Sequence, residues 1–193
     1  MTSPFARPWI FAKHIAGIAY QLVPGDPLVS TEQCRLDAEL MQTIGANSIR
    51  VYHVDPDANH DGCMAAFSDA GIYPWIDLDT FDTYLYTEDG AHWNETQYVR
   101  FQKVMDAFAN YDNVAGFFVA NELLTTGQSS VGAPFIKAAA RDMKAYRDEK
   151  GYRKFLIGYS AADIADLRPN LQNYMACGSD PAEALDFYSL NVC

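Results

Sequence analysis

The chain has 193 residues, of which 49% are hydrophobic and 20% charged, so it is long enough to bury a substantial core as one globular domain. Its formal net charge of −11 argues against nucleic acids and anionic membrane surfaces as partners, because both are bound by basic faces. A neutral ligand such as a polysaccharide is compatible with this charge.

Targeting and anchoring segments are not evident in the sequence. No run of about 18 apolar residues occurs, so we expect no transmembrane segment. Pro4, Pro8 and Lys13 interrupt the region where a signal peptide needs a continuous apolar stretch. The carboxyl end has no hydrophobic tail of the kind that signals a lipid anchor. We expect residues 1–14 to form an irregular extension and residues 15–193 to form one domain.

The first half of the chain predicts three strands and two helices. A strand over residues 15–20 precedes a helix over 31–44, which Ser30 or Thr31 can cap and Gly45 ends. A second strand over 48–54 is followed by a short helix over 61–70, which Gly71 closes. The third strand covers 72–78.

The second half continues the same alternation. A long helix over 94–109 precedes a fourth strand over 116–120. The next helix starts at Pro134 and stops before Gly151, an asymmetry typical of helices. Two more strands, over 155–160 and 186–191, complete the pattern.

Alternating strands and helices predict parallel β/α units. No G-x-G-x-x-G motif or P-loop is present, which disfavours a doubly wound nucleotide-binding sheet, and we expect no cofactor. Polar residues gather instead at the carboxyl ends of the strands, where (β/α)8 barrels build their active sites. They are Gln21, Tyr52, Asp77, Asn121, Glu122 and Tyr159. We therefore predict an α/β fold, a (β/α)8 TIM barrel truncated to about six β/α units.

Glu122 is the strongest catalytic candidate. It follows the apolar run 116–120 and Asn121, an arrangement that many barrel glycosidases use for their acid/base carboxylic acid. Burial at a strand end raises the pKa of a carboxyl group, as a general acid requires. Asn121 could hydrogen-bond a sugar 2-hydroxyl. The alternative is a helix-capping pair at a strand-to-helix turn.

The other candidates have equally ordinary explanations. Asp77 is as often a loop cap as a functional group at a strand end. Tyr52 and Tyr159 could aim hydroxyls into the mouth of a barrel, although buried core tyrosines are more common. Gln21 has the same ambiguity.

Metal sites are not supported by the sequence. Residues 55–62 imitate the start of an EF-hand loop, but His60 stands where the turn needs Gly, and Ala66 where the closing Glu belongs. His53, His60 and Cys63 lack the further ligands of a zinc site. The four cysteines, at 34, 63, 177 and 193, form no C-x-x-C pair and leave the redox compartment open.

One short motif suggests a modification. Asn94-Glu95-Thr96 is a sequon for N-glycosylation. We expect Asn94 to be exposed and to carry a glycan if the protein enters the secretory pathway.

Six segments, taken in order, resemble the fungal β-1,3-glucanosyltransferases of glycoside hydrolase family 72. One of them covers residues 106–122 and ends in VANE, and the most specific is the last, GYSAADIADLRP over residues 158–169. The others are Gly17–Gln21, Arg50–Pro56, Asn59–Cys63 and Arg141–Tyr146, and the resemblance covers the chain from about residue 15 to 191.

This resemblance implies a retaining mechanism with two glutamates, which cleaves β-1,3-glucan internally and passes the new reducing end to another glucan. Glu122 matches the acid/base and Asn121 its partner, whereas Gln21, Tyr52 and Asp77 match positions that bind glucose units. Cys34 and Cys63 match a disulfide pair that joins the first two β/α units. The family is secreted, faces the cell wall and is normally held to the plasma membrane by a glycolipid anchor.

The end of the chain departs from the family pattern. After Leu190-Asn191 the family continues with Tyr-Glu-Trp-Cys, where this chain has Val192-Cys193. The nucleophile glutamate belongs to the following strand, so we expect the chain to be a truncated form that is inactive alone. Two alternatives stay open: a plain endo-β-1,3-glucanase in the full-length parent, and a catalytically dead glucan-binding remnant.

Overall fold

Six parallel strands form one sheet in the computed structural model, which describes residues 14–22, 24–80, 83–87 and 90–191. Their order in the sheet is β1-β2-β3-β6-β7-β8, so each strand pairs with the next one along the chain apart from a short insertion. The strands are β1 Gly17–Ala19, β2 Ser48–Val51, β3 Tyr73–Asp77, β6 Gly116–Asn121, β7 Leu156–Ala162 and β8 Phe187–Asn191.

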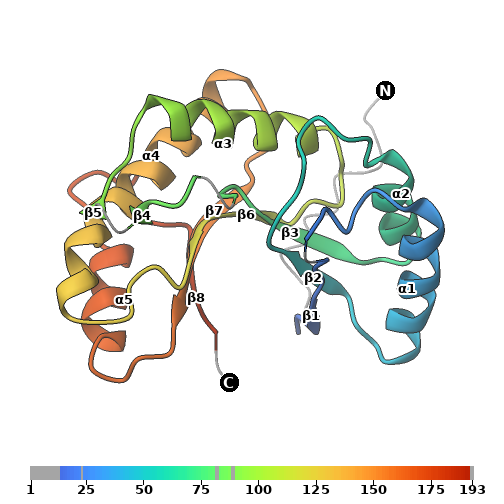
Figure 1. Ribbon diagram of the computed structural model, residues 1–193, viewed down its shortest axis with the longest axis horizontal. Coiled ribbons are helices and arrows are strands. Elements are labelled where there is room, and N and C mark those ends of the chain that lie inside the picture. Colours follow the sequence, from blue (N-terminus) through green and yellow to red (C-terminus); the bar gives the residue numbers. More distant parts are fainter. Residues whose placement is uncertain (1–13, 23, 81–82, 88–89, 192–193) are drawn as a thin grey trace.

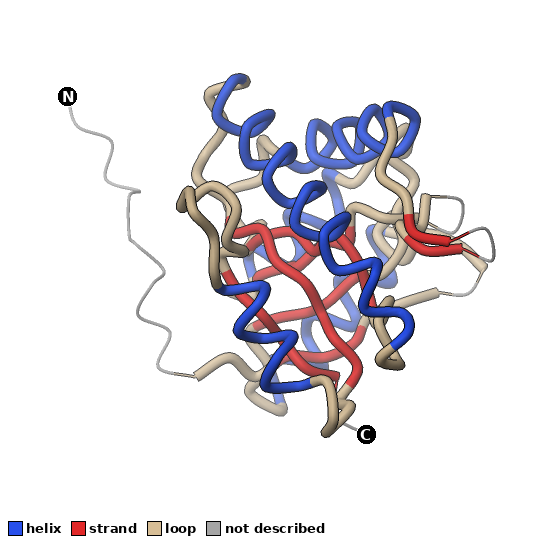
Figure 2. The backbone as a smooth tube through the Cα atoms, turned by 90° about the vertical axis from the view of Figure 1, so that its left-hand side faces the viewer, coloured by secondary structure: helices blue, strands red, loops and turns tan. Residues whose placement is uncertain are grey.

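A helix follows each of the first five strands of this sheet. They are α1 Thr31–Thr43, α2 Asp61–Asp69, α3 Glu95–Phe108, α4 Ala133–Glu149 and α5 Arg168–Ala176. The helices lie in an arc around the strands, from α1 and α2 on one side to α4 and α5 on the other (Figure 1). The view turned by 90° shows helices both in front of and behind the strands (Figure 2). No helix in the described ranges is long and apolar enough to cross a membrane.

The sheet is strongly curved, as a hydrogen bond between side chains of two distant strands shows. Four strand spacings separate β2 from β8, which would be about 19 Å in a flat sheet. Yet Nη1 of Arg50 on β2 donates a hydrogen bond of 3.2 Å to Oδ1 of Asn191 on β8. The two strands therefore face each other across the concave side, as in an incompletely closed barrel, and the predicted truncated (β/α) barrel is confirmed.

Three rings fill the interior of this barrel below the polar residues. Trp75, Phe118 and Phe187 come from three strands, and their ring centroids lie 4.9 to 5.9 Å apart in tilted or edge-to-face contacts. We call them the aromatic layer. The layer needs a glycine beside it, because a Cβ on Gly158 would lie 2.4 Å from the Phe187 carbonyl oxygen and 2.7 Å from its ring.

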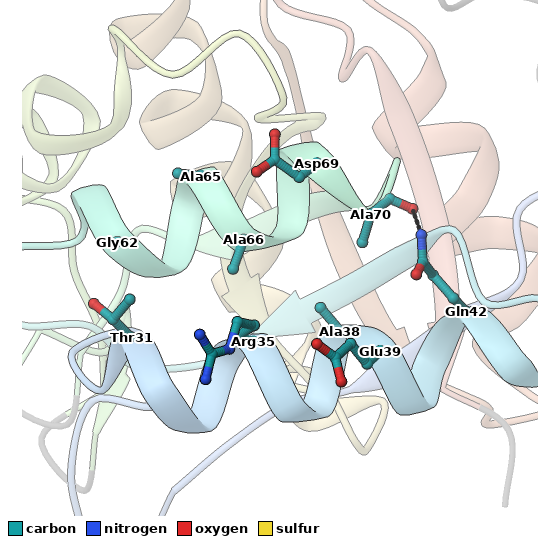
Figure 3. Close-up of a pocket in the computed structure, with 10 residues that line it drawn as sticks. All are labelled: Thr31, Arg35, Ala38, Glu39, Gln42, Gly62, Ala65, Ala66, Asp69 and Ala70. Atoms are coloured by element: carbon teal, nitrogen blue, oxygen red, sulfur yellow. Dashed lines mark hydrogen bonds between the residues drawn. The ribbon is translucent and has the colours of Figure 1, made fainter.

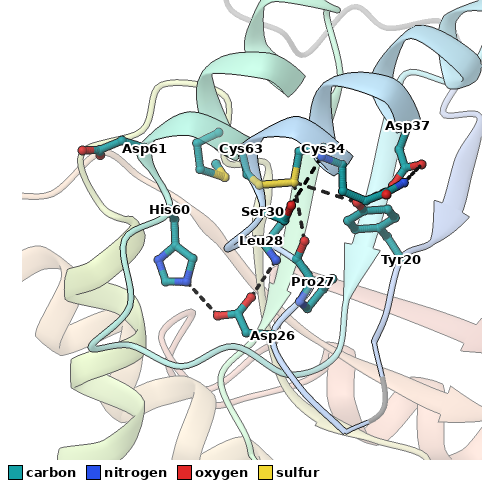
Figure 4. Close-up of a disulfide and its surroundings, with 12 residues drawn as sticks. Tyr20, Asp26, Pro27, Leu28, Ser30, Cys34, Asp37, His60, Asp61 and Cys63 are labelled. Atoms are coloured by element: carbon teal, nitrogen blue, oxygen red, sulfur yellow. Dashed lines mark hydrogen bonds and ion pairs between the residues drawn. A yellow bond between two sulfur atoms is a disulfide. The ribbon is translucent and has the colours of Figure 1, made fainter.

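The first two helices are fastened to each other. Cys34 on α1 and Cys63 on α2 form a disulfide with an S–S distance of 2.02 Å, so the predicted pairing is confirmed (Figure 4). Beside it, Gly62 faces Thr31 so closely that an added Cβ would lie 1.9 Å from the threonine Oγ1 (Figure 3). A groove of about 400 Å³ runs on between the helices and contains none of the predicted site residues.

The predicted elements agree with the structure to within a few residues. All six strands and four helices are present, with Ser30 capping α1 and with Gly45, Gly71 and Gly151 at positive φ after their helices. The sequence reading missed α5, the hairpin of β4 Tyr86–Thr87 and β5 Gly90–Ala91, and the 3-10 helix η2 Gln128–Gly132. The extension predicted for residues 1–14 lies almost entirely outside the described residues.

Candidate active site

Arg50 is the centre of a polar layer inside the barrel, above the aromatic layer. Its Nε and Nη2 donate to both carboxylate oxygens of Asp77, at 3.0 and 2.8 Å. Nη2 also donates to Oδ1 of Asn121 at 3.0 Å, and Nη1 donates to Oγ of Ser160 at 2.6 Å as well as to Asn191. We call these five residues, which come from five different strands, the interior polar layer.

Aromatic rings hold the Arg50 guanidinium in place. Its Cζ lies 4.0 Å from the centroid of Phe118 and 4.4 Å from that of Tyr52. Contact with ring faces favours a cation, and more so where water is excluded. The half-buried Tyr52, a predicted sugar-binding residue, is thus seen supporting the arginine with its ring.

Two buried carboxyl groups lie next to this cation. Asp77 is 1% exposed and Asp79 is 2% exposed. Burial raises the pKa of Asp77 to about 6, although the charge and the hydrogen bonds of Arg50 act in the opposite direction. Burial, and then the negative charge of Asp77, raise the pKa of Asp79 well above its usual range. Of the two carboxyl groups, Asp77 is the one whose charge Arg50 directly bridges, and Asp79 is the one whose proton is held more tightly.

Asn121 is oriented by two donors. Its Oδ1 accepts hydrogen bonds from Arg50 and from Nδ2 of Asn191, the latter at 2.9 Å. Because the carbonyl end of the amide is engaged by the protein, the Nδ2 end is the one turned away from the interior polar layer. Asn121 is only half-buried, so this amide can donate to a ligand in the mouth of the barrel.

Glu122 follows directly and has an unusual backbone. Its φ of 47° makes it the one residue other than glycine with positive φ in the described part of the chain. Such a conformation costs a non-glycine residue about 1–2 kcal/mol and is found preferentially at functional sites. The Glu122 N–H still donates to the Ser160 carbonyl at 2.8 Å, so the turn begins while the residue is held by β7.

Tyr159 supports the loop after Glu122 from within the core. It is fully buried, and its hydroxyl accepts a hydrogen bond of 3.2 Å from the Leu124 N–H. Successive side chains of a strand point to opposite faces. Since Ser160 points into the barrel, Tyr159 points out toward the helices. The structure thus places the Tyr159 side chain outside the barrel interior, in the core between the strands and the helices, which is the more ordinary of the two explanations considered for it.

Gln21 is exposed and lies two residues beyond the end of β1. Two side-chain contacts, one made by Tyr20 and one by Asp26, hold the loop on either side of it (Figure 4). The Tyr20 hydroxyl donates to Asp37 at 2.7 Å. Farther along, the Asp26 carboxylate contacts Nε2 of the buried His60 at 2.8 Å and accepts from backbone N–H groups. These two contacts, together with the disulfide, hold the rim of the barrel beside Gln21 in place.

The sequence reading missed the residues that organise the site. The sequence points to Arg50 only as part of a segment that resembles the family, and it marks neither Ser160 nor Asn191. A usable signal existed, because an arginine inside the short apolar strand 48–51 must find partners when it is buried. Within the ranges that the structure describes, no group of three or more His, Cys, Asp and Glu side chains could hold a metal ion.

Known proteins share both the sequence and the fold. The sequence profile of the glucanosyltransferase family matches residues 11–193. The chain belongs to this family. Its relatives include 1,3-beta-glucanosyltransferase PGA5 of Candida albicans, 42% identical over 86% of the chain, and 1,3-beta-glucanosyltransferase gas5 of Schizosaccharomyces pombe, 40% identical over 93%. The resemblance inferred from the motifs is confirmed.

A solved structure of a similar yeast protein shows the same fold. Gas2p of Saccharomyces cerevisiae, determined in complex with laminaritriose and laminaritetraose, matches 92% of this chain with a TM-score of 0.86 at 36% identity. The chain spans 41% of that protein, and 27% and 36% of the two relatives named above. It therefore corresponds to about a third of the length of these three proteins.

Proposed function

We propose that this chain forms part of the catalytic barrel of a 1,3-β-glucanosyltransferase, with Glu122 as acid and then base. The observation that carries the proposal is the turn at Glu122, where a strained backbone follows an asparagine held by the interior polar layer. Membership of the family supports the reaction type. The substrate is then β-1,3-glucan, the class to which the laminari-oligosaccharides bound by Gas2p belong.

In the first step Glu122 gives its proton to the glycosidic oxygen while a second carboxylate attacks the anomeric carbon from the opposite face. The bond to the leaving sugar breaks, and a covalent glycosyl-enzyme forms. In the second step Glu122 removes the proton from a hydroxyl of the acceptor glucan, which attacks the same carbon and releases the second carboxylate. Asn121 donates from Nδ2 to the sugar 2-hydroxyl in both steps.

The remaining site residues have supporting roles in this proposal. Arg50 and Asp77 hold the Asn121 amide in orientation, and Tyr159 holds the loop that carries Glu122. Gln21, exposed on the rim, and Tyr52 contact glucose units on the donor side. Within the described residues, Glu122 is the sole glutamate at the carboxyl end of a strand of the six-stranded sheet, so the second carboxylate comes from a further strand of the complete barrel.

An extracellular location follows from the same proposal. The Cys34–Cys63 disulfide is buried and joins two helices, and such bonds persist in oxidising compartments. We place the parent protein at the cell wall, attached to the plasma membrane by the glycolipid anchor usual in its family.

A grafted barrel tests the proposal. Residues 15–191 replace the matching segment of Gas2p, and the products formed from a laminari-oligosaccharide are sized by mass spectrometry. We expect products longer than the substrate from the graft, and none from residues 1–193 alone, because a retaining reaction needs two carboxylates about 5–5.5 Å apart. A folded graft that yields only shorter products indicates hydrolysis instead of transfer, and a folded graft that yields no products contradicts the proposal.

A further inference from the structure

A small pocket lies on the outside of the barrel, where α3 begins beside α4. Its volume is about 370 Å³, and it is lined by Trp93, Asn94, Glu95, Tyr98, Asp142 and Ala145. None of these six residues belongs to the interior polar layer or to the predicted sugar-binding positions. The function proposed above gives this pocket no role.

The walls of the pocket are held rigidly. Nε1 of Trp93 donates to Oδ2 of Asp142 at 2.8 Å, and Nη2 of Arg141 lies 2.7 Å from the other oxygen of that carboxylate. The Trp93 ring packs on Phe101 at 5.1 Å and meets Tyr98 edge to face at 6.0 Å between centroids. The pocket is therefore formed before any ligand arrives, and its aromatic walls cannot easily collapse.

The chemistry of the pocket suits a neutral sugar. Trp93 and Tyr98 are half-buried, so each ring offers part of its surface to the pocket. Apolar ring surface packs against the C–H face of a pyranose, and the Asp142 carboxylate can accept from a hydroxyl or amide N–H. No lining residue is basic, whereas two are acidic, which disfavours an anionic ligand.

Asn94 itself is arranged so that its amide nitrogen is available. It is the exposed N-cap of α3, where its Oδ1 accepts from the Gln97 N–H at 3.2 Å and its own N–H donates to the Gln97 side chain at 2.9 Å. These two capping bonds use Oδ1 and the main chain, not Nδ2. A substituent on Nδ2 thus leaves the capping box intact, and Asn94-Glu95-Thr96 is a glycosylation sequon.

We propose that Asn94 carries an N-linked glycan whose first N-acetylglucosamine lies in this pocket against Trp93 and Tyr98. In the transfer, Nδ2 bonds to C1 of a lipid-diphosphate-linked oligosaccharide. The C1–O bond to the diphosphate breaks, the lipid diphosphate leaves with the electron pair, and the nitrogen loses one proton to the transferase. The glycan then covers the partly exposed rings of Trp93 and Tyr98 and links the start of α3 to α4.

The attachment is tested in a yeast host with the full chain behind a secretion signal. Peptides are mapped before and after enzymatic glycan removal, in both secreted and microsomal material. We expect a glycan on Asn94 in the wild type and in Thr96→Ser, which keeps the sequon, and none in Thr96→Ala or Asn94→Asp. Asn94→Asp retains the capping acceptor, so it separates loss of the glycan from loss of the cap. An unmodified Asn94 in both fractions of the wild type overturns the proposal.

The position of the first sugar is tested on glycosylated protein whose glycan has been trimmed to a single N-acetylglucosamine. We expect nuclear Overhauser effects between its acetamide methyl and the ring protons of Trp93 or Tyr98. We also expect a Tm about 3 °C above that of the same sequence made without glycan in a bacterial periplasm, the size of shift that one good aromatic contact gives in a chain of this length. Tyr98→Ala removes this difference. Equal Tm values together with no such effects contradict a sugar in the pocket. Glucan transfer enters none of these readouts, so failure here is distinct from failure of the proposed function.

Discussion

Replacing Arg50 by methionine tests whether one guanidinium holds the interior polar layer together. Arg50 makes five hydrogen bonds in that layer, and its side chain is 13% exposed against 1% for Asp77. Methionine keeps an apolar stem between the rings of Tyr52 and Phe118 but leaves Asp77 buried without its cation. Removing one partner of a buried ion pair typically destabilises a protein by about 3–5 kcal/mol. We expect Arg50→Met to lie in this range at neutral pH.

The size of this loss depends on pH in a defined direction. In the wild type, burial raises the pKa of Asp77 to about 6, so stability declines as the pH rises from about 4 to about 6. The methionine variant lacks the influence of Arg50 that lowers this pKa, and the folded state then holds the Asp77 proton to a higher pH. The loss relative to wild type therefore begins to grow near pH 6, where Asp77 of the wild type gives up its proton, and it increases by up to about 1.4 kcal/mol for each further pH unit.

Urea unfolding of the full chain, followed by circular dichroism at about pH 4.5 and about pH 8, measures both effects. Asp77→Asn in the Arg50→Met background removes the unpaired charge, and we expect it to recover at least about 1 kcal/mol at the higher pH. A loss below about 1 kcal/mol, or a loss equal at the two pH values, would refute the account of the interior polar layer.

Three further substitutions test other parts of the fold. Gly158→Ala should destabilise the chain by about 1–3 kcal/mol, because the added Cβ would collide with Phe187. The control, Gly127→Ala, places its Cβ in open space and should change the free energy of unfolding little. Equal effects in the two variants would argue against a closely packed aromatic layer. Tyr159→Phe should lower the free energy of unfolding in urea by about 1–3 kcal/mol, because it leaves the Leu124 N–H without its acceptor. It should also lower the transfer rate of the grafted barrel. An unchanged transfer rate would show that Tyr159 does not support Glu122. The double variant Cys34→Ser/Cys63→Ser should lower the free energy of unfolding by about 3.5 kcal/mol, the value that the chain-entropy model gives for a separation of 29 residues. A thermal midpoint equal to that of the oxidised wild type would contradict a stabilising disulfide.

Much of the fold could be predicted because its signals are local. Short apolar runs gave the six strands, and helix ends were marked by Ser30, Pro134 and the glycines that follow three helices. The missed elements lacked such signals. The strands β4 and β5 have two residues each, too few for a periodic pattern, and α5 buries only Leu171 and Met175.

The site was harder to predict because its contacts are distant in the sequence. Arg50 meets partners that lie 27 to 141 residues away, and no local pattern announces such a set. The two explanations that the sequence leaves open for Tyr159 have a different origin. A strand buried on both faces shows a continuous apolar run, so the sequence does not reveal which side chains point into the barrel. The contact of Ser160 with Arg50 decides it.

The family resemblance made the proposed acid/base, Glu122, easier to find than the residues that support it. Glu122 ends a specific motif, so its position needed no long-range information. The backbone strain at its φ of 47° could not be read from the sequence, because a glutamate has no intrinsic preference for that region. The residues that hold Asn121 and the following loop emerge only from the three-dimensional arrangement.

Chemical rescue tests the role of Glu122 most directly. The grafted barrel with Glu122→Ala receives a laminari-oligosaccharide whose activated aryl leaving group departs without a proton, so the glycosyl-enzyme still forms. Its breakdown then needs a base, unless a nucleophile such as azide, which requires none, takes the place of the acceptor. The account predicts that azide restores turnover and gives a β-glycosyl azide. No rescue in a folded variant, or an α-configured product, would contradict Glu122 as the acid/base.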